Sequence, residues 1–195
     1  MDKPKRVMAA ISGASGAVYA RRLLEALPSF YDTIYLTASD NALGIIKDEL
    51  GVDTLADLMP HAHLHKFSML NYTDLSAPTA SGSHDYDGLI VIPCSMGVVG
   101  RIAAGVSSDL VTRAADVCLK ERRKLVLVVR ETPLSLVHLR NLTALTEAGA
   151  IVMPAAPAFY HDPKSIDDLV DFVVDRALRA LGLNTHIIYG WGERS

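Results

Sequence analysis

Short apolar runs that alternate with helical patterns constrain the fold of this sequence more than any other feature. Residues 88–93 and 125–129 are apolar throughout, as in strands that are buried on both faces of a parallel sheet. Shorter β-rich runs cover residues 6–12, 32–38 and 150–153. Strands that alternate with helices predict an α/β protein with a doubly wound parallel sheet in a single domain.

Capping residues predict where the helices begin and end. Ser39 is a typical N-cap for a helix that ends at Gly51, and Ser165 with Asp168 forms a capping-box pattern. Pro133 suits the first position of another helix. Residues 52–86 show the least regular pattern. The expected helices cover residues 17–27, 40–50, 108–123, 132–148 and 166–181.

Composition excludes several classes of protein. Lysine and arginine number 19 against 22 aspartates and glutamates, a net charge of −3 that argues against a nucleic-acid binder. Half of the residues are hydrophobic, yet no stretch approaches the ~18 apolar residues of a membrane helix. We therefore expect the surplus apolar surface to be buried in a homo-oligomer without membrane contact. Two cysteines and an N-terminal apolar run of only five residues favour a cytoplasmic protein.

The loops after the strands are the places to look for a ligand, because doubly wound sheets bind ligands at the carboxyl ends of their strands. Gly13 and Gly16 in the first loop allow close backbone approach, and the helix N-terminus there favours an anion. The loop is not a GxGxxG dinucleotide motif. A nucleotide or flavin phosphate and a plain tight turn both remain open for this loop. Ser39 is either a helix cap alone or, with the helix N-terminus, also holds a phosphate.

Other strand ends carry polar groups or small residues. Cys94 reads as inert packing, whereas Ser95 and Gly97 suit a surface that lies against a flat ring. Arg130 next to Glu131 indicates anion binding beside an acid/base group, or else a structural ion pair.

The last strand is followed by two further candidates. Tyr160 can hydrogen-bond a phosphate oxygen, and Arg176 either meets an anion or faces solvent. His61, His63 and His65 would share one face of a strand, but a fourth metal ligand is missing, so we expect no metal.

Seven motifs in their order along the chain carry a family resemblance. Residues 6–183 resemble the UbiX-type flavin prenyltransferases, with the weakest match at residues 51–74. The motifs are SGASG at 12–16, APTASGS at 77–83, PCS at 93–95, TRAAD at 112–116, LKERR at 119–123, VRETP at 129–133 and residues 154–163.

The resemblance implies a three-layer, flavodoxin-like Rossmann fold in a homododecamer, with a C-terminal tail at residues 184–195. It implies a metal-independent prenyltransferase that joins the dimethylallyl group of dimethylallyl monophosphate to N5 and C6 of reduced FMN. The product, prenyl-FMN, would pass to a partner decarboxylase of the UbiD type. Ubiquinone biosynthesis and the degradation of aromatic acids are both open as the pathway served.

The resemblance also assigns roles to residues. A proton relay would pair Ser15 with Glu131, and Trp191 would fold over a neighbouring subunit's site. Leu75 stands where family members can carry an aromatic residue. The catalytic positions are Ser15, Glu49, Lys120 and Glu131. Flavin contacts are expected from Gly13, Ala14, Ser15, Ser39, Ser95, Met96, Gly97, Val98, Arg113 and Arg130. Substrate contacts are expected from Ser81, Lys120, Tyr160 and Arg176.

Two alternatives compete with the prenyltransferase. An FMN-dependent decarboxylase of the peptidyl-cysteine or phosphopantothenoylcysteine type would need a histidine and an asparagine motif, and residues 13–16 and 77–83 contain neither residue type. A flavin-storage module would not need the second phosphate site that Lys120, Tyr160 and Arg176 indicate.

Overall fold

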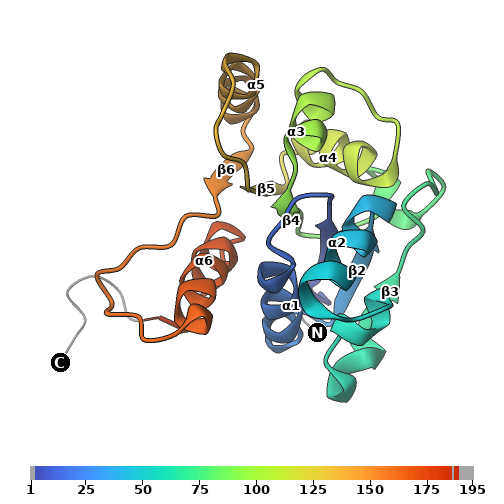
Figure 1. Ribbon diagram of the computed structural model, residues 1–195. Helices are drawn as coiled ribbons and strands as arrows, with labels where there is room; N and C mark the ends of the chain where they lie inside the picture. Colours follow the sequence, from blue (N-terminus) through green and yellow to red (C-terminus); the bar gives the residue numbers. More distant parts are fainter. Residues whose placement is uncertain (1–2, 186, 189–195) are drawn as a thin grey trace.

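The computed structural model describes residues 3–185 and 187–188, and its centre is one sheet of six parallel strands (Figure 1). The strands lie in the order β3-β2-β1-β4-β5-β6. Their bounds are β1 Arg6–Ile11, β2 Thr33–Ala38, β3 Phe67–Met69, β4 Gly88–Cys94, β5 Lys124–Val129 and β6 Ile151–Pro154. The α-helices are α1 Ala17–Ala26, α2 Asp40–Leu50, α3 Met96–Ala103, α4 Leu110–Lys120, α5 Leu136–Glu147 and α6 Ile166–Ala180.

The strand order confirms the predicted doubly wound sheet. The five longer strands follow the flavodoxin-like order, and the three-residue β3 adds an outer edge strand. The chain turns back between β1 and β4, so the topological switch point lies where these two strands end. A ligand crevice is expected at that point in such sheets.

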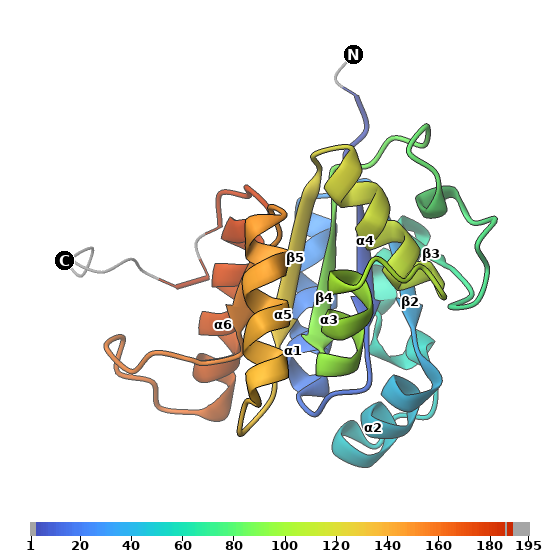
Figure 2. The same ribbon diagram turned by 90° about the horizontal axis from the view of Figure 1, so that it is seen from above.

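Alternating strand residues pack against the two helical layers. Val7 and Ile11 of β1 belong to the core under α1 and α6, whereas Met8 and Ala10 belong to the core under α3 and α4. Figure 2 shows α3, α4 and α5 together over one face of the sheet. The result is the three-layer architecture that the sequence predicted.

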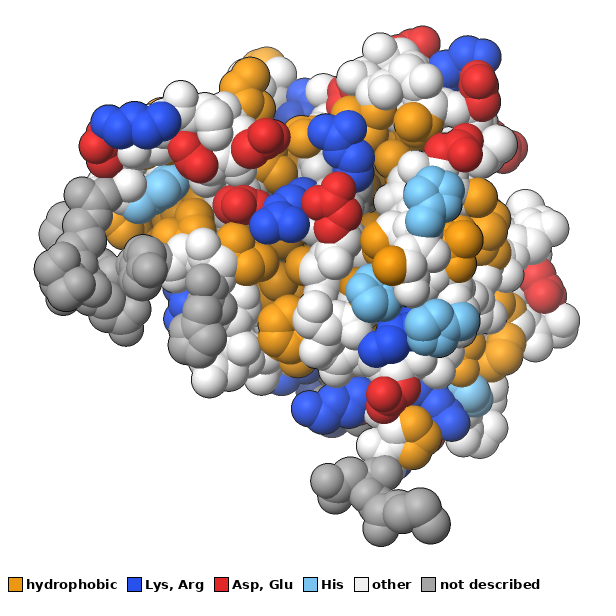
Figure 3. All heavy atoms as spheres, turned by 90° about the horizontal axis from the view of Figure 1, so that it is seen from below, with side chains coloured by type: hydrophobic (Ala, Val, Ile, Leu, Met, Phe, Trp, Pro, Cys, Tyr) orange, Lys and Arg blue, Asp and Glu red, His pale blue; other side chains and the backbone are white. Residues whose placement is uncertain are grey.

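The outer face of α1 and α6 carries charges of both signs. Arg22 of α1 pairs with Glu25 on its own helix and with Asp171 of α6. Figure 3, which views this face, shows acidic and basic side chains lying next to one another. Among the described residues, no helix is both long and apolar enough to cross a bilayer.

The helix predicted to begin at Thr132–Pro133 begins later. Leu136 is the first residue of α5, because the Ser135 hydroxyl accepts the amide of His138 as an N-cap. Pro133 therefore lies in the preceding loop, and the prediction that it opens the helix is wrong. The hydroxyl of an N-cap serine accepts a backbone amide of the first helical turn, whereas a proline at the helix start has no side-chain acceptor for that amide.

Helix α3 was absent from the sequence-based expectation. Gly97 and Gly100 lower its intrinsic helix propensity, and this hides the segment from a pattern search. In the structure Ser95 caps its N-terminus, and four of its apolar side chains are buried. Tertiary burial thus overrides weak propensity here.

The irregular segment 52–86 holds β3 and three short 3-10 helices, Leu55–Leu58, His61–Lys66 and Pro78–Ala80. The Lys66 ammonium donates to the carbonyls of Pro28 (2.6 Å) and Tyr31 (3.2 Å), which fixes the segment to the end of the first crossover. His61, His63 and His65 lie on a 3-10 helix, so they do not share one face of a strand as the alternation suggested. In the part of the chain that the structure describes, no cluster of three His, Cys, Asp or Glu side chains could hold a metal ion.

Candidate active site

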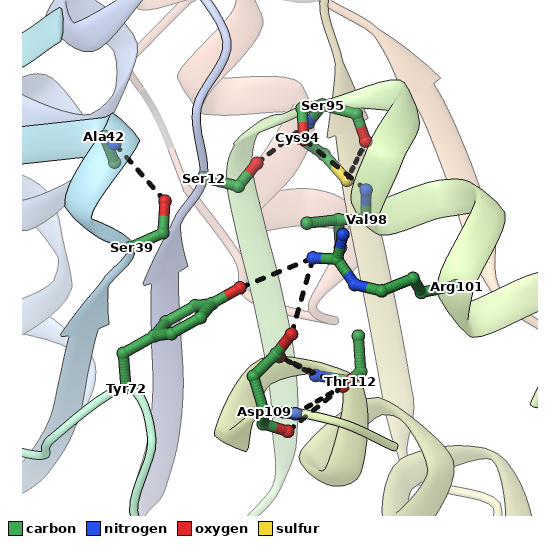
Figure 4. Close-up of polar contacts among 10 residues, drawn as sticks. All are labelled: Ser12, Ser39, Ala42, Tyr72, Cys94, Ser95, Val98, Arg101, Asp109 and Thr112. Atoms are coloured by element: carbon green, nitrogen blue, oxygen red, sulfur yellow. Dashed lines mark hydrogen bonds and ion pairs between the residues drawn. The ribbon is translucent and has the colours of Figure 1, made fainter. Parts of the chain in front are cut away.

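The ends of β1 and β4 are joined by the hydroxyl of Ser12. This side chain is buried; it donates to the carbonyl of Pro93 (3.0 Å) and accepts the amide of Ser95 (2.8 Å; Figure 4). The loops after β1 and β4 are therefore held together at the topological switch point. Sequence reasoning had given Ser12 no role of its own, because its partners are 81 and 83 residues away.

Two helix N-termini open onto this edge of the sheet. The hydroxyl of Ser39 accepts the amide of Ala42 (3.2 Å) at the start of α2, and that of Ser95 accepts the amide of Val98 (3.5 Å) at the start of α3. Both serines are thus caps in this structure. The partial positive charge of the two helix ends makes the edge favourable for an anion.

A carboxylate of the chain itself occupies the first glycine loop. Glu49, in the last turn of α2, accepts the amides of Gly16 (3.0 Å) and Ala17 (2.8 Å) at the start of α1. Partial burial opposes its ionisation, but hydrogen bonds from the Ser15 hydroxyl and the two amides, together with the charge of Arg130, hold the pKa of Glu49 below its usual value. The loop therefore does select an anion, and in this structure the anion is Glu49.

Arg130 belongs to the same group. Its Nε donates to the carbonyl of Ser15 (3.1 Å), while the Glu131 carboxylate accepts the amide of Thr132 (3.0 Å). The described contacts of Arg130 and Glu131 do not include an ion pair between the two, and the charge of Arg130 acts on Glu49 instead. The structure thus brings Ser15 together with Glu49 and Arg130, whereas the resemblance had paired Ser15 with Glu131.

The segment beyond the β4 strand end presents backbone rather than side chains. Met96 and Val98 point into the core, whereas Gly97 is exposed. Any contact of residues 96–98 with a flavin would therefore come from the main chain. Cys94 is fully buried, and burial raises the pKa of its thiol to about 12, which supports inert packing.

Ser81, Arg113 and Lys120 form a second group. Arg113 of α4 donates through Nε to the carbonyl of Ala80 (3.0 Å), and Lys120, the last residue of α4, pairs with its neighbour Glu121. Gly82 lies against that pair, since a Cβ added there would come within 2.7 Å of the Lys120 ammonium. The Ser81 loop is therefore held along α4, by Arg113 in its first half and beside Lys120 at its end.

This second group does not meet the glycine loop within one chain. Lys120 precedes β5, so it lies toward the amino ends of the strands, whereas residues 12–16 follow the carboxyl end of β1. The 11 residues of α4 separate the two edges by about 16 Å at 1.5 Å per residue. Lys120 and the glycine loop of one protomer therefore lie toward opposite edges of the sheet.

Tyr160 and Arg176 form a third group at the β6 edge. The Tyr160 ring packs edge-on against Phe172 of α6 at 5.8 Å, and exposed Arg176 lies one helical turn further on. Arg176 also lines a cavity of about 500 Å³ between β6 and α6. Both residues therefore lie close to Phe172 on the β6 side of the sheet. Leu75 is about half exposed, and Trp191 lies outside the described residues.

The carboxyl edge suits a flavin nucleotide. It combines two capped helix N-termini, the exposed backbone of Gly97 and the cation Arg130. A further guanidinium, that of Arg101, has a buried Nε without a partner among the described residues. Donors of this kind match the oxygen-rich, anionic groups of FMN.

Comparison with known proteins decides the family. A family model described as Flavoprotein matches residues 1–178. A flavin prenyltransferase UbiX from Thermoplasma acidophilum is 45% identical over 190 residues, which cover 95% of this chain and 99% of that protein. The chain belongs to the UbiX flavin prenyltransferase family.

Solved structures agree with this assignment to the UbiX family. The structure of AnUbiX (PadA1) in complex with FMN and dimethylallyl pyrophosphate matches with a TM-score of 0.91 at 40% identity, covering 99% of this chain and 100% of that one. A dodecameric FMN-dependent UbiX-like decarboxylase from Escherichia coli O157:H7 matches with a TM-score of 0.88 at 42% identity, covering 95% and 98%. The flavodoxin-like fold and the enzyme class expected from the sequence are thereby confirmed.

Proposed function

We propose that the protein transfers the dimethylallyl group of dimethylallyl monophosphate to N5 and C6 of reduced FMN and releases prenyl-FMN and phosphate. One observation carries the proposal: the chain has more anion-binding groups than a flavin nucleotide needs. The carboxyl edge with Arg130 suits the flavin, and a second set suits another phosphate. That second set comprises Ser81, Lys120, Tyr160 and Arg176.

The three groups lie apart on one chain, and a site built from several chains would bring them together. The exposed apolar side chains of Leu136, Val137 and Leu139 on α5, with exposed fractions of 61%, 63% and 48%, favour burial against another copy. A dodecamer like that of the E. coli relative would bring the Lys120 and Tyr160 groups of neighbouring chains to the glycine loop. Gly13, Ala14 and Gly97 would then contribute backbone contacts to the flavin.

The cations would stabilise the leaving group. Breaking the allyl C–O bond transfers its electron pair to phosphate, and the guanidinium and ammonium groups would hold the charge that develops there without a metal ion. Ser15 and Glu131 would handle the proton that leaves N5. Bond formation at C6 then loses one proton from the ring and gains one on the allyl unit. The net change is therefore one C5H8 unit.

Mass spectrometry of the flavin tests this reaction directly. The protein is incubated anaerobically with FMN, a reductant and dimethylallyl monophosphate, and the flavin is then released. A flavin heavier by C5H8 is the expected result, and recovery of unchanged FMN from a protein that binds it would contradict the proposal. Dimethylallyl diphosphate in a parallel reaction tests the donor preference.

Variants at the third group separate flavin binding from transfer. Tyr160→Phe and Arg176→Ala should keep FMN affinity near that of the unmodified protein and slow product formation by about 100-fold or more, because they remove contacts to the leaving phosphate. Titration of FMN fluorescence and the mass assay provide the two measurements. A loss of flavin binding in either variant would show that these residues belong to the flavin site.

The cysteine-decarboxylase alternative has weaker support. An FMN-dependent cysteine decarboxylase of thioviridamide biosynthesis matches with a TM-score of 0.61 at 16% identity, which shows a common fold alone. The histidine and asparagine that this class requires are absent from residues 13–16 and 77–83. Carbon dioxide release from a peptide with a C-terminal cysteine would favour this alternative.

We also propose that prenyl-FMN passes to a UbiD-type decarboxylase in the cytoplasm. A modified flavin that its producer releases needs an acceptor enzyme, and the chain's composition carries no sign of a membrane helix. Activation of a flavin-free UbiD-type enzyme by the reaction mixture would support this transfer. Failure of purified prenyl-FMN, separated from the protein, to activate the same preparation would show that the acceptor itself is inactive.

A further inference from the structure

Arg101 of α3 is a cation near the carboxyl edge to which sequence reasoning gave no role. Its Nη2 lies 3.4 Å from a carboxylate oxygen of Asp109 and 3.5 Å from the hydroxyl of Tyr72. Figure 4 shows these two side chains approaching the guanidinium from different elements, the start of α4 and the segment after β3. The start of α4 and the segment after β3 thus hold this cation in place.

The two partners of Arg101 are themselves fixed. The other carboxylate oxygen of Asp109 accepts the amide (2.8 Å) and the hydroxyl (3.0 Å) of Thr112 in a capping box. The carbonyl of Tyr72 accepts the amide of Leu110 (2.8 Å). Partners that are rigidly held reduce the entropy that Arg101 would lose on binding a ligand.

The guanidinium retains hydrogen-bonding capacity. Arginine has five N–H donors, and the contacts to Asp109 and Tyr72 involve only Nη2. Nη1 lies beside the exposed Gly97, 3.7 Å from the position of a Cβ added to that glycine. An anionic acceptor placed over Gly97 would therefore lie next to a charged donor that is already oriented.

We infer that Arg101 binds an anionic oxygen group of the flavin nucleotide, with Asp109 and Tyr72 as its positioning residues. The inference rests on the proposed function, which places a flavin over Gly97. The shared chemistry is a negatively charged oxygen, and FMN has two sources of it: the phosphate and the pyrimidine edge of the reduced ring. A planar guanidinium matches either group through paired hydrogen bonds.

The experiment compares FMN with riboflavin, which lacks the phosphate. Dissociation constants are measured anaerobically for both flavins, oxidised and reduced, with the full-length protein and its Arg101→Met variant. Loss of one charge-assisted hydrogen bond should weaken binding by about 10- to 100-fold. Arg21→Met, at an exposed arginine of α1, is the matched control and should bind flavin as the unmodified protein does.

The pattern of loss identifies the oxygen that Arg101 contacts. Weaker binding of FMN in both redox states, with riboflavin unaffected, assigns the phosphate. Weaker binding of the reduced forms of both flavins, with a lower midpoint potential of the bound flavin, assigns the ring edge. Unchanged affinities and an unchanged potential would overturn the inference.

Conservative variants keep the test decisive if Arg101→Met misfolds. Arg101→Lys retains the charge and should recover part of the affinity, whereas Tyr72→Phe removes only one hydroxyl and should cause a smaller loss in the same direction. Asp109→Asn preserves the helix cap and removes the counter-charge. If all three bind flavin as the unmodified protein does, the inference is wrong.

Prenyl transfer is assayed separately on the unmodified protein. Arg101-dependent flavin affinity without formation of prenyl-FMN would retain this inference and refute the proposed reaction. If prenyl-FMN forms but the flavin affinity does not depend on Arg101, the proposed reaction is retained and this inference is refuted.

Discussion

Glu49 shows how a single residue determines what the first glycine loop binds. The free amides of Gly16 and Ala17 would suit a phosphate, but the Glu49 carboxylate accepts both. The Ser15 side chain also hydrogen-bonds this carboxylate, and Arg130, which donates to the Ser15 carbonyl, adds a favourable charge. The phosphate of a bound nucleotide would then be held at the other helix ends or by a cation such as Arg130.

The lowered pKa of Glu49 predicts a pH-dependent contribution to stability. Its folded-state pKa lies below the unfolded value, so the stabilisation is present above the unfolded pKa and is lost as pH falls through the folded pKa. Glu49→Gln should lower the free energy of unfolding at pH 7 by about 0.5–1 kcal/mol, the usual size of a charge at a helix N-terminus.

Urea unfolding between pH 3 and 7 measures this effect. The difference between Glu49→Gln and the unmodified protein should shrink as the solution becomes more acidic. Asp48→Asn, an exposed neighbour on α2, is the control and should show no comparable trend. A difference that stays constant from pH 7 to 3 would mean that the carboxylate contact is not electrostatic.

At the scale of elements, local chemistry accounts for where α2 begins and ends. Ser39 caps its start, and Gly51 ends it in the left-handed region with φ +68°. The same local reasoning failed for α5, where Ser135 rather than Pro133 sets the start. Two signals that favour helix starts competed, and the sequence alone did not rank them.

Substitution by alanine should have opposite effects on stability at Gly44, inside α2, and at Gly51, which follows the helix. Gly51→Ala should cost about 1 kcal/mol, because an L-residue is strained at positive φ and a Cβ meets nothing within 4 Å that could compensate. Gly44→Ala, inside the helix and equally free of contacts, should stabilise by about 0.5–1 kcal/mol. Denaturant unfolding of both variants measures the two values, and equal signs would refute this account of the helix end.

At the scale of the whole molecule, the site groups lie at three separate places on one chain. Lys120 lies toward the amino ends of the strands, Ser15 at the carboxyl end of β1, and Tyr160 beside the outer strand β6. Parallel topology dictates this separation, because each crossover helix carries the chain from one edge of the sheet to the other. The apolar outer surface of α5 offers the contact through which chains could combine their groups.

Mixed oligomers test whether the site is shared. Ser15→Ala and Lys120→Ala should each be nearly inactive alone, whereas co-assembly should restore about a quarter of the activity if every site draws the two residues from different chains. The mass assay for prenyl-FMN measures the recovery, and separately purified variants mixed without reassembly are the control. No recovery after reassembly would place both residues in a site built by one chain.

Sequence reasoning determined the features that depend on local pattern. The buried runs 88–93 and 125–129, the caps Ser39 and Ser165, and the stop at Gly51 follow from apolar periodicity and from satisfying helix-end amides. The order of the motifs identified the family, because residue types and their spacing are read directly from the sequence and need no three-dimensional contact. The burial of Cys94 was also predicted correctly.

Other features were decided only by the tertiary structure, because they depend on contacts between distant segments. Ser12 joins two strand ends, Glu49 reaches the start of another helix, and Arg101 is held by Tyr72 and Asp109. Hydrogen bonds of this kind form only after the sheet brings its loops together, so periodicity carries no trace of them. Local propensity therefore predicted most of the elements, with α3 as the exception, and the convergence of strand ends decided which side chains meet.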